Sequence, residues 1–100
     1  MFVHHVLFWL KDDMSKTDIQ NFEEALQSLL KIEYVKYGDI GKPAAATKPV
    51  IDSSYSYSLL TVFDNQEGHD LYQPHPVHKN FLEQFSPFYK KVLVYDSETI

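Results

Sequence analysis

The order of the predicted elements indicates an α+β domain of the ferredoxin-like kind, β-α-β-β-α-β. Alternation of apolar residues with a period of two is typical of strands, and apolar offsets of three and four are typical of amphipathic helices. The sequence shows the first pattern in residues 3–10 and 54–63, the second over residues 15–30, and a second helix broken at Pro74. This order places four antiparallel strands in one sheet, with the helices on one face.

The first strand, over residues 3–10, has two apolar faces. Successive side chains of a strand point to opposite sides. The two rows are Val3, His5, Leu7 and Trp9, and His4, Val6, Phe8 and Leu10. Since both rows are mainly apolar, both faces should be covered. We assign the first row to the helices and expect Val6, Phe8 and Leu10 to face the sheet of an identical chain, so the domain is predicted to be a homodimer.

The first helix is predicted over residues 15–30. Ser15 is a suitable N-cap, and Asp18 follows three positions later, in a weakened form of the capping box. One apolar stripe runs along the helix through Ile19, Phe22, Leu26, Leu29 and Leu30. Such a stripe indicates a helix that packs one face on a core.

The middle of the chain is predicted as strand, loop and strand. Residues 32–37 form a weak strand pattern that we expect to end at Gly38 and Gly41, and residues 41–54 have no usable period. A loop of that length in a compact domain is commonly functional or disordered. Residues 54–63 alternate well and should form a central strand.

The second helix is predicted in two pieces. Asp64 or Asn65 can cap a short helix to about Gln73, where Pro74 stops it. Pro76 suits the first position of the next helix, which should end near residue 87. The apolar residues of 90–96 then predict the last strand.

Composition limits the classes of function. The 100 residues suit one domain, 1–100, and 44% of them are hydrophobic and 15% aromatic, a large apolar supply for so small a core. The net charge of −5 argues against nucleic acid as a partner, and the lack of cysteine excludes disulfides and cysteine-ligated zinc. No apolar run is long enough to span a membrane, so we expect a cytoplasmic protein with no membrane partner.

The segment Tyr72-Gln73-Pro74-His75-Pro76-Val77-His78 holds the strongest chemical signal. A histidine titrates near neutral pH and suits acid–base catalysis, and a tyrosine hydroxyl can donate a hydrogen bond to a carbonyl. His78 and Tyr72 are therefore the candidate catalytic residues. The structural interpretation is that His75 only caps the helix and His78 only bonds a neighbouring element.

A pocket between sheet and helices would be lined by the residues predicted to face it. These are His5, Trp9, Phe22, Leu26, Tyr57 and Phe81. The simpler alternative is that they only fill the core. We expect no metal site, because the spacing of His75 and His78 is not that of a zinc helix, and we expect no cofactor, because no glycine-rich phosphate loop is present.

Three segments resemble one known family, the stress-responsive A/B-barrel (Dabb) domain. They are His5-Val6-Leu7-Phe8-Trp9-Leu10-Lys11, Tyr72-x-x-His75-Pro76-x-His78, and Lys91-Val92-Leu93-Val94-Tyr95-Asp96. The resemblance covers nearly the whole chain in the same order. It implies a dimeric α+β barrel in which two ferredoxin-like protomers pack sheet to sheet with their helices outside.

The resemblance also implies a range of functions. A plant branch of the family closes linear polyketides by aldol condensation without a cofactor, using a histidine base and a tyrosine. Those roles would fall on His78 and Tyr72, with His5 lining the pocket. Tyr57 replaces a histidine expected in that branch, and Trp9 is larger than the aliphatic residue expected there.

The first hypothesis is therefore a protein that binds a small organic molecule, as a cofactor-independent cyclase, isomerase or lyase. Two alternatives stay open: a non-catalytic, stress-associated dimeric domain, and a cofactor-free monooxygenase.

Overall fold

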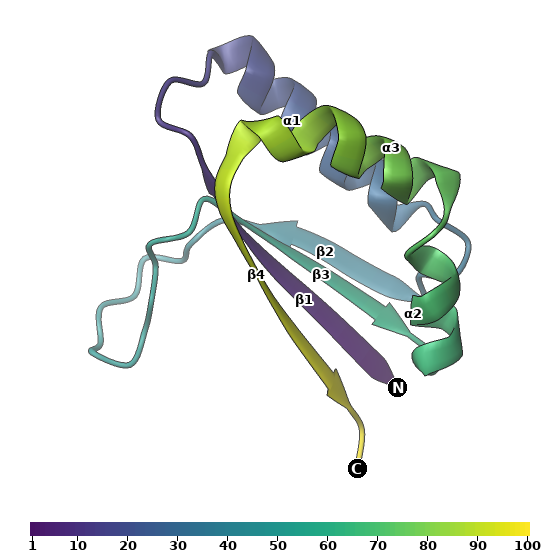
Figure 1. The fold of residues 1–100 in the computed structure, drawn as a ribbon. Helices are drawn as coiled ribbons and strands as arrows, with labels where there is room; N and C mark the ends of the chain where they lie inside the picture. Colours follow the sequence, from purple (N-terminus) through teal and green to yellow (C-terminus); the bar gives the residue numbers. More distant parts are fainter.

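The computed structural model describes residues 1–100 as one antiparallel sheet with helices on one face (Figure 1). Its elements are β1 Phe2–Leu10, α1 Lys16–Leu30, β2 Tyr37–Gly41, β3 Tyr57–Phe63, α2 Gln66–Tyr72, α3 Pro76–Phe85, a 3₁₀ turn Ser86–Phe88 and β4 Tyr89–Glu98. The strand order is β2-β3-β1-β4, and every neighbouring pair is antiparallel. The predicted β-α-β-β-α-β ferredoxin-like fold is confirmed. None of the helices has the length and apolar character needed to cross a membrane.

The helices begin at the predicted caps. The side chain of Ser15 accepts a hydrogen bond from the backbone N–H of Asp18, and that of Asn65 accepts one from Gly68. His75 caps α3 by accepting a hydrogen bond at Nδ1 from the backbone N–H of Val77, 3.1 Å away. Each bond satisfies an N–H group that has no partner inside the helix. The break between α2 and α3 therefore lies at residues 73–75, as Pro74 predicts.

The second strand lies later in the chain than residues 32–37, which corrects the prediction. Ile32 is buried in the core, and the backbone N–H of Val35 donates to its carbonyl in a turn. The strand begins only at Tyr37, and it continues through Gly38 instead of ending there. Leu30 lies against Gly38 so closely that a Cβ there would be 2.4 Å from Leu30 Cδ2. Glycine at this position therefore allows Leu30 of α1 to pack closely on β2.

The long connection after β2 contains no helix or strand from residue 42 to residue 56 and extends away from the sheet (Figure 1). The central strand consequently starts at Tyr57, three residues later than predicted. The returning end of the loop is tied to β1: Ser56 N–H donates to the carbonyl of Phe8 at 2.7 Å, and Trp9 Nε1–H donates to Ser54 Oγ at 3.1 Å.

The two rows of β1 side chains face the sides of the sheet opposite to those predicted. Phe2, His4, Val6, Phe8 and Leu10 are buried beneath the helices, and the alternate residues are only partly covered. Phe8 contacts Phe22 of α1 and Phe81 of α3, with ring centroids 5.4 and 6.0 Å apart. The prediction that Val6, Phe8 and Leu10 face a partner chain is therefore wrong. Hydropathy could not decide between the rows, because both are apolar.

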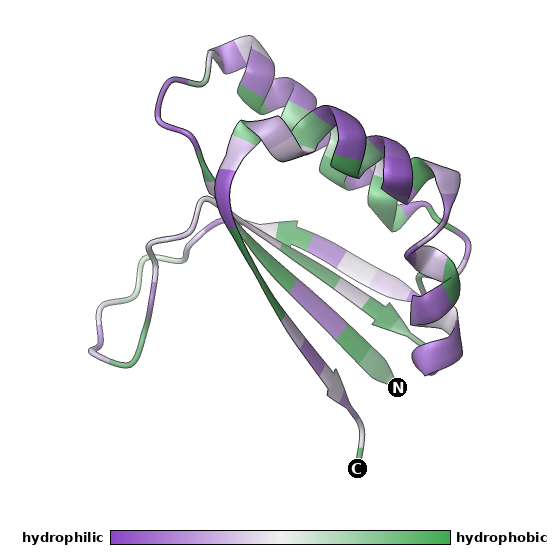
Figure 2. Ribbon diagram, in the orientation of Figure 1, coloured by the Kyte–Doolittle hydropathy of each residue, from purple (hydrophilic) through white to green (hydrophobic).

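The face of the sheet away from the helices also carries many apolar residues, and Figure 2 shows that hydrophobic residues occur along the strands. Cross-strand partners share a face, so the strand register identifies its members. They include Val3, His5, Leu7 and Trp9 from β1, Leu60 and Val62 from β3, and Leu93 and Tyr95 from β4. No helix covers this set, which we call the outer sheet face (Figure 1).

Candidate functional site

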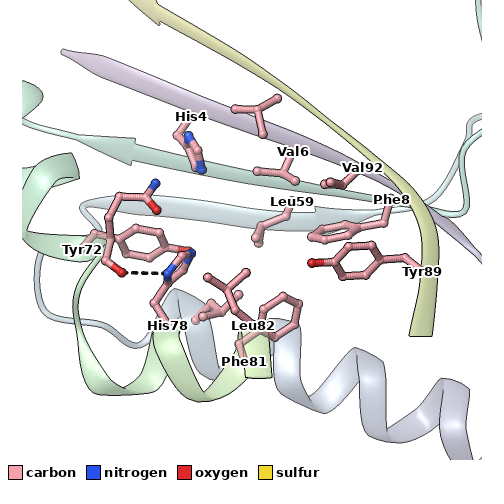
Figure 3. Close-up of a pocket in the computed structure, with 13 residues that line it drawn as sticks. His4, Val6, Phe8, Leu59, Tyr72, His78, Phe81, Leu82, Tyr89 and Val92 are labelled. Atoms are coloured by element: carbon pink, nitrogen blue, oxygen red, sulfur yellow. Dashed lines mark hydrogen bonds between the residues drawn. The ribbon is translucent and has the colours of Figure 1, made fainter. Parts of the chain in front are cut away.

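A cavity of about 190 Å³ lies between the sheet and the pair α2–α3. Figure 3 shows its walls: β1 and β3 on one side, α2 and α3 on the other, and β4 along its length. Its lining is His4, Val6, Phe8, Leu29, Leu59, Tyr72, Gln73, His78, Phe81, Leu82, Tyr89, Val92 and Val94. Because β4 extends beyond the helices, Val92 and Val94 are 43% and 44% exposed, and the cavity is open on that side.

His78 lies in the first turn of α3 and is held by the end of α2. Its Nδ1 is 2.9 Å from the backbone carbonyl of Gln73 (dashed line in Figure 3). A carbonyl only accepts, so Nδ1 carries the hydrogen and Nε2 keeps its lone pair. Burial lowers the pKa of His78 below 6.5, and the bond to Gln73 opposes this only in part. His78 is therefore a neutral imidazole with an unprotonated Nε2 at neutral pH.

Tyr72, the last residue of α2, lies beside His78 with its ring only 1% exposed. The ring centroids of Tyr72 and His78 are 4.7 Å apart, and Phe63 packs on the tyrosine at 5.1 Å. Its hydroxyl makes no hydrogen bond within the protein, and it is not sealed off, since no buried polar side-chain atom lacks a partner. Burial raises the pKa of Tyr72, so the hydroxyl stays protonated and can donate a hydrogen bond.

A second tyrosine lies at the other end of the cavity. Tyr89 begins β4 and packs on Phe8 at 5.1 Å. Figure 3 shows its hydroxyl directed along the cavity toward the end that holds Tyr72 and His78. Burial raises the pKa of Tyr89 as well. The cavity thus has polar groups at both ends and apolar walls between them.

His4 is the most important cavity residue that the sequence reasoning missed. Its neighbour His5 was expected in the cavity, and His4 was expected to face the partner chain. Instead His4 points from β1 into the cavity (Figure 3), and its Nδ1 is 2.5 Å from Asp96 Oδ1 of β4. Asp96 lies opposite His4 in the strand register. That pairing of β1 with β4 was the one signal that could have revealed His4.

The structure brings together only part of the predicted site. Phe81 lines the cavity with Tyr72 and His78. The prediction that His5 and Trp9 line the cavity is wrong. Both lie on the outer sheet face, because the other row of β1 side chains faces the helices.

The remaining predicted residues also lie outside the cavity. Phe22 and Leu26 are fully buried and do not reach it, since they fill the core between α1 and the sheet. Tyr57 lies at the far end of β3, where its hydroxyl donates to Glu23 of α1.

The two buried histidines predict a loss of stability in acid. Burial is the largest influence on His4 and His78 and lowers both pKa values below 6.5, against the opposing effect of Asp96 on His4. In the unfolded chain both should titrate near 6.5, so below that pH the unfolded state binds more protons. The free energy of unfolding should be constant above about pH 7 and fall as the pH is lowered through 6.5.

Urea denaturation between pH 7.5 and 5.5 measures this dependence, and His78→Gln should reduce its slope. A free energy of unfolding that stays constant or rises over this range would contradict the prediction.

Comparisons with known proteins agree with the fold. The family model of the stress responsive A/B barrel domain, Dabb, matches residues 2–99. The chain belongs to the Dabb family. No protein with a curated description matches it.

Solved structures share the Dabb fold of this chain. A protein from Arabidopsis thaliana is similar with a TM-score of 0.83 and 26% identity, over 100% of this chain and 96% of the other. A dimeric ferredoxin-like protein of unknown function from Thermobifida fusca matches with a TM-score of 0.79 and 20% identity, over 98% and 90%. A hydroxynitrile lyase from Passiflora edulis matches with 0.79 and 17%, over 99% and 95%.

Proposed function

We propose that this Dabb domain binds a small, single-ring carbonyl compound in the cavity and catalyses a proton transfer on it, as a cyclase, isomerase or lyase does. The observation that carries the proposal is the pair formed by His78 and Tyr72. An imidazole with an unprotonated Nε2 lies next to a tyrosine hydroxyl that has no partner in the protein. The first is a base, and the second is a hydrogen-bond donor for the oxygen on which negative charge develops.

The cavity supports a substrate of limited size. Pockets for drug-sized ligands measure about 300–1,000 Å³. The cavity here measures about 190 Å³, which suits one ring with a short substituent. Its apolar middle would hold the ring, and the polar end would hold the carbonyl. Tyr89 at the other end offers a hydroxyl to a polar ring substituent.

The reactions of a cyclase, an isomerase and a lyase share one step on such a substrate. A base removes a proton from the carbon next to the carbonyl or from a hydroxyl, and the enolate or alkoxide is stabilised by a donor. One protein of the same fold is named a hydroxynitrile lyase, so this fold is compatible with that kind of chemistry. The base and the hydrogen-bond donor proposed here, His78 and Tyr72, are both side chains of this chain.

The experiment that tests the function is hydrogen–deuterium exchange at carbon. Phenylacetone is incubated in D₂O at pD 7.5 with the protein, and the loss of its α-hydrogen signals is followed by NMR. We expect exchange above the buffer rate, and cleavage of mandelonitrile tests the lyase reaction in parallel. If the protein neither accelerates exchange or cleavage nor shows amide shifts around the cavity with either compound, the proposed function is wrong.

We also infer that two copies of the chain associate through the outer sheet face. The support is the unpartnered apolar surface of that face, together with the dimeric description of the Thermobifida fusca protein of the same fold. This pairing leaves the helices outside and keeps the cavity, on the other side of the sheet, within each copy. Phe8 is no part of the proposed interface; Leu7 and Trp9 are.

A further inference from the structure

One cluster of side chains next to the cavity has the composition of a metal centre. His4, His69 and Asp96 each offer one ligand atom, and the three atoms lie within 4.8 Å of one another. They come from β1, α2 and β4, so one ion would join three elements. We propose that His4, His69 and Asp96 bind a divalent transition metal through a two-histidine, one-carboxylate ligand set.

His69 is oriented for this role by its own neighbours. Its Nδ1 is 3.2 Å from Asp70 Oδ1, and its Nε2 is 3.0 Å from Gln73 Nε2. A carboxylate accepts and an amide nitrogen donates, so Nδ1 carries the hydrogen and Nε2 holds the lone pair. The ring also stacks on Phe2, with centroids 4.5 Å apart. A carboxylate behind a histidine in this way fixes the ring and increases its basicity toward a metal.

His4 and Asp96 can complete the ligand set if the hydrogen bond between them is broken. Ligands at about 2.0–2.2 Å in a tetrahedron around zinc are about 3.4 Å apart. In the metal-free chain Asp96 Oδ1 accepts the Nδ1 hydrogen of His4 at 2.5 Å. For Nδ1 to bind an ion, that hydrogen would have to move to Nε2 of His4 and the distance to Asp96 would have to open. The side chain of Asp96 is 40% exposed at the last strand and can turn, whereas that of His4 is only 7% exposed.

The charge around the cluster is suited to a cation. The ion-pair partner of Asp96 is His4, and that of Asp70 is His69; no lysine pairs with either carboxylate. The two carboxylates therefore bring negative charge to this corner. A bound divalent cation would offset that negative charge.

The ligand types indicate which metals would bind. Imidazole nitrogens suit zinc and other first-row transition metals, whereas magnesium and calcium prefer oxygen ligands throughout. Three protein ligands leave a position for water. His4 also lines the cavity, so the ion would lie at the cavity edge. This proposal replaces the expectation of no metal site, which considered only the spacing of His75 and His78.

The proposal does not depend on the proposed function, because Tyr72 and His78 are not among the ligands. If Tyr72 and His78 proved not to be catalytic, the proposed metal site would be unaffected. If the site bound no metal, the proposed function would be unaffected. Tyr72→Phe should therefore bind metal as the wild type does.

Calorimetric titration of the metal-free chain with Zn²⁺ at pH 7.5 tests the site. We expect one ion per chain, and His69→Gln and Asp96→Asn should each weaken binding more than about 100-fold. Asp70→Asn, which removes only the carboxylate behind His69, should weaken it about 10- to 100-fold. His75→Gln is the matched control, since it changes another histidine near the same helix break, and it should bind as the wild type does.

Co²⁺ serves as a second probe, because its weak visible d–d bands in water become much stronger when a protein site holds the ion in four- or five-coordinate geometry. This increase should occur with the wild type and not with His69→Gln, and Mg²⁺ should produce no heat. The side chains of His69 and Asp96 both reach the surface, so these variants should fold, which circular dichroism verifies. No Zn²⁺ binding, equal binding by the wild type and both ligand variants, or equal binding of Mg²⁺ would each overturn the proposal.

Discussion

His78→Ala should lower the rate of α-hydrogen exchange on phenylacetone by about 10²–10⁴-fold, the usual contribution of a positioned general base. The variant removes the imidazole whose Nε2 is left unprotonated by the bond from Nδ1 to Gln73. Tyr72→Phe should cost less, about 10-fold, because it removes one hydrogen bond and keeps the ring. NMR measurement of the exchange rate at pD 7.5 provides both values.

His75→Ala is the matched control for this prediction. His75 lies three residues before His78, but its Nδ1 caps α3 and it does not line the cavity. The control should lose about 1 kcal/mol of stability with the cap and keep the wild-type exchange rate. The wild-type rate should also be constant above about pH 7 and fall in acid, because protonation removes the base and the pKa of His78 lies below 6.5. Equal rates for His78→Ala and the wild type would exclude His78 as the base.

Local signals in the sequence predicted the elements well. Ser15 and His75 cap helices in the structure as expected, and Pro74 separates α2 from α3. These signals depend on a few neighbouring residues, and each has a direct physical cause in the unpaired N–H groups of a helix end or the missing N–H of proline. The break at Pro74 in turn brings the Gln73 carbonyl to His78, so this part of the candidate site follows from local sequence.

The second strand was placed too early because tertiary packing competes with local pattern. Residues 32–37 contain enough apolar side chains for a strand. Ile32, however, is buried in the hydrophobic core just after the end of α1. Gly38 was expected to end the strand and instead continues it, and its missing side chain leaves room for Leu30 of α1. Neither contact is visible without the position of α1 on the sheet.

The side of β1 that faces the cavity could not be predicted from β1 alone. A strand with two apolar rows fits either face of a sheet, and an error of one residue exchanges all of its side chains. The choice is made by contacts with residues far along the chain, such as Phe8 with Phe81 and His4 with Asp96. The same error hid His4, and with it the cluster that we propose to bind metal.

If two copies associate through the outer sheet face as proposed, a single charge at Leu7 should separate them. Burying a large aliphatic side chain contributes about 1.5–3 kcal/mol, and a two-fold interface contains each residue twice. Leu7→Asp should therefore weaken association by about 3–6 kcal/mol, which raises the dissociation constant about 10²–10⁴-fold. Leu7 is not part of the core that lies between the sheet and the helices, so the variant should still fold.

Sedimentation at micromolar concentration measures the change, and Leu71→Asp is its control. Leu71 is an exposed leucine on α2, away from the outer sheet face, whereas Leu7 is half-buried in the single chain. The control should remain a dimer, as should the wild type. The single tryptophan, Trp9, lies on the same face as Leu7, so its fluorescence should change on dilution of the wild type and not of Leu7→Asp. A monomeric wild type, or a dimeric Leu7→Asp, would show that the outer sheet face is not an interface between copies of this chain.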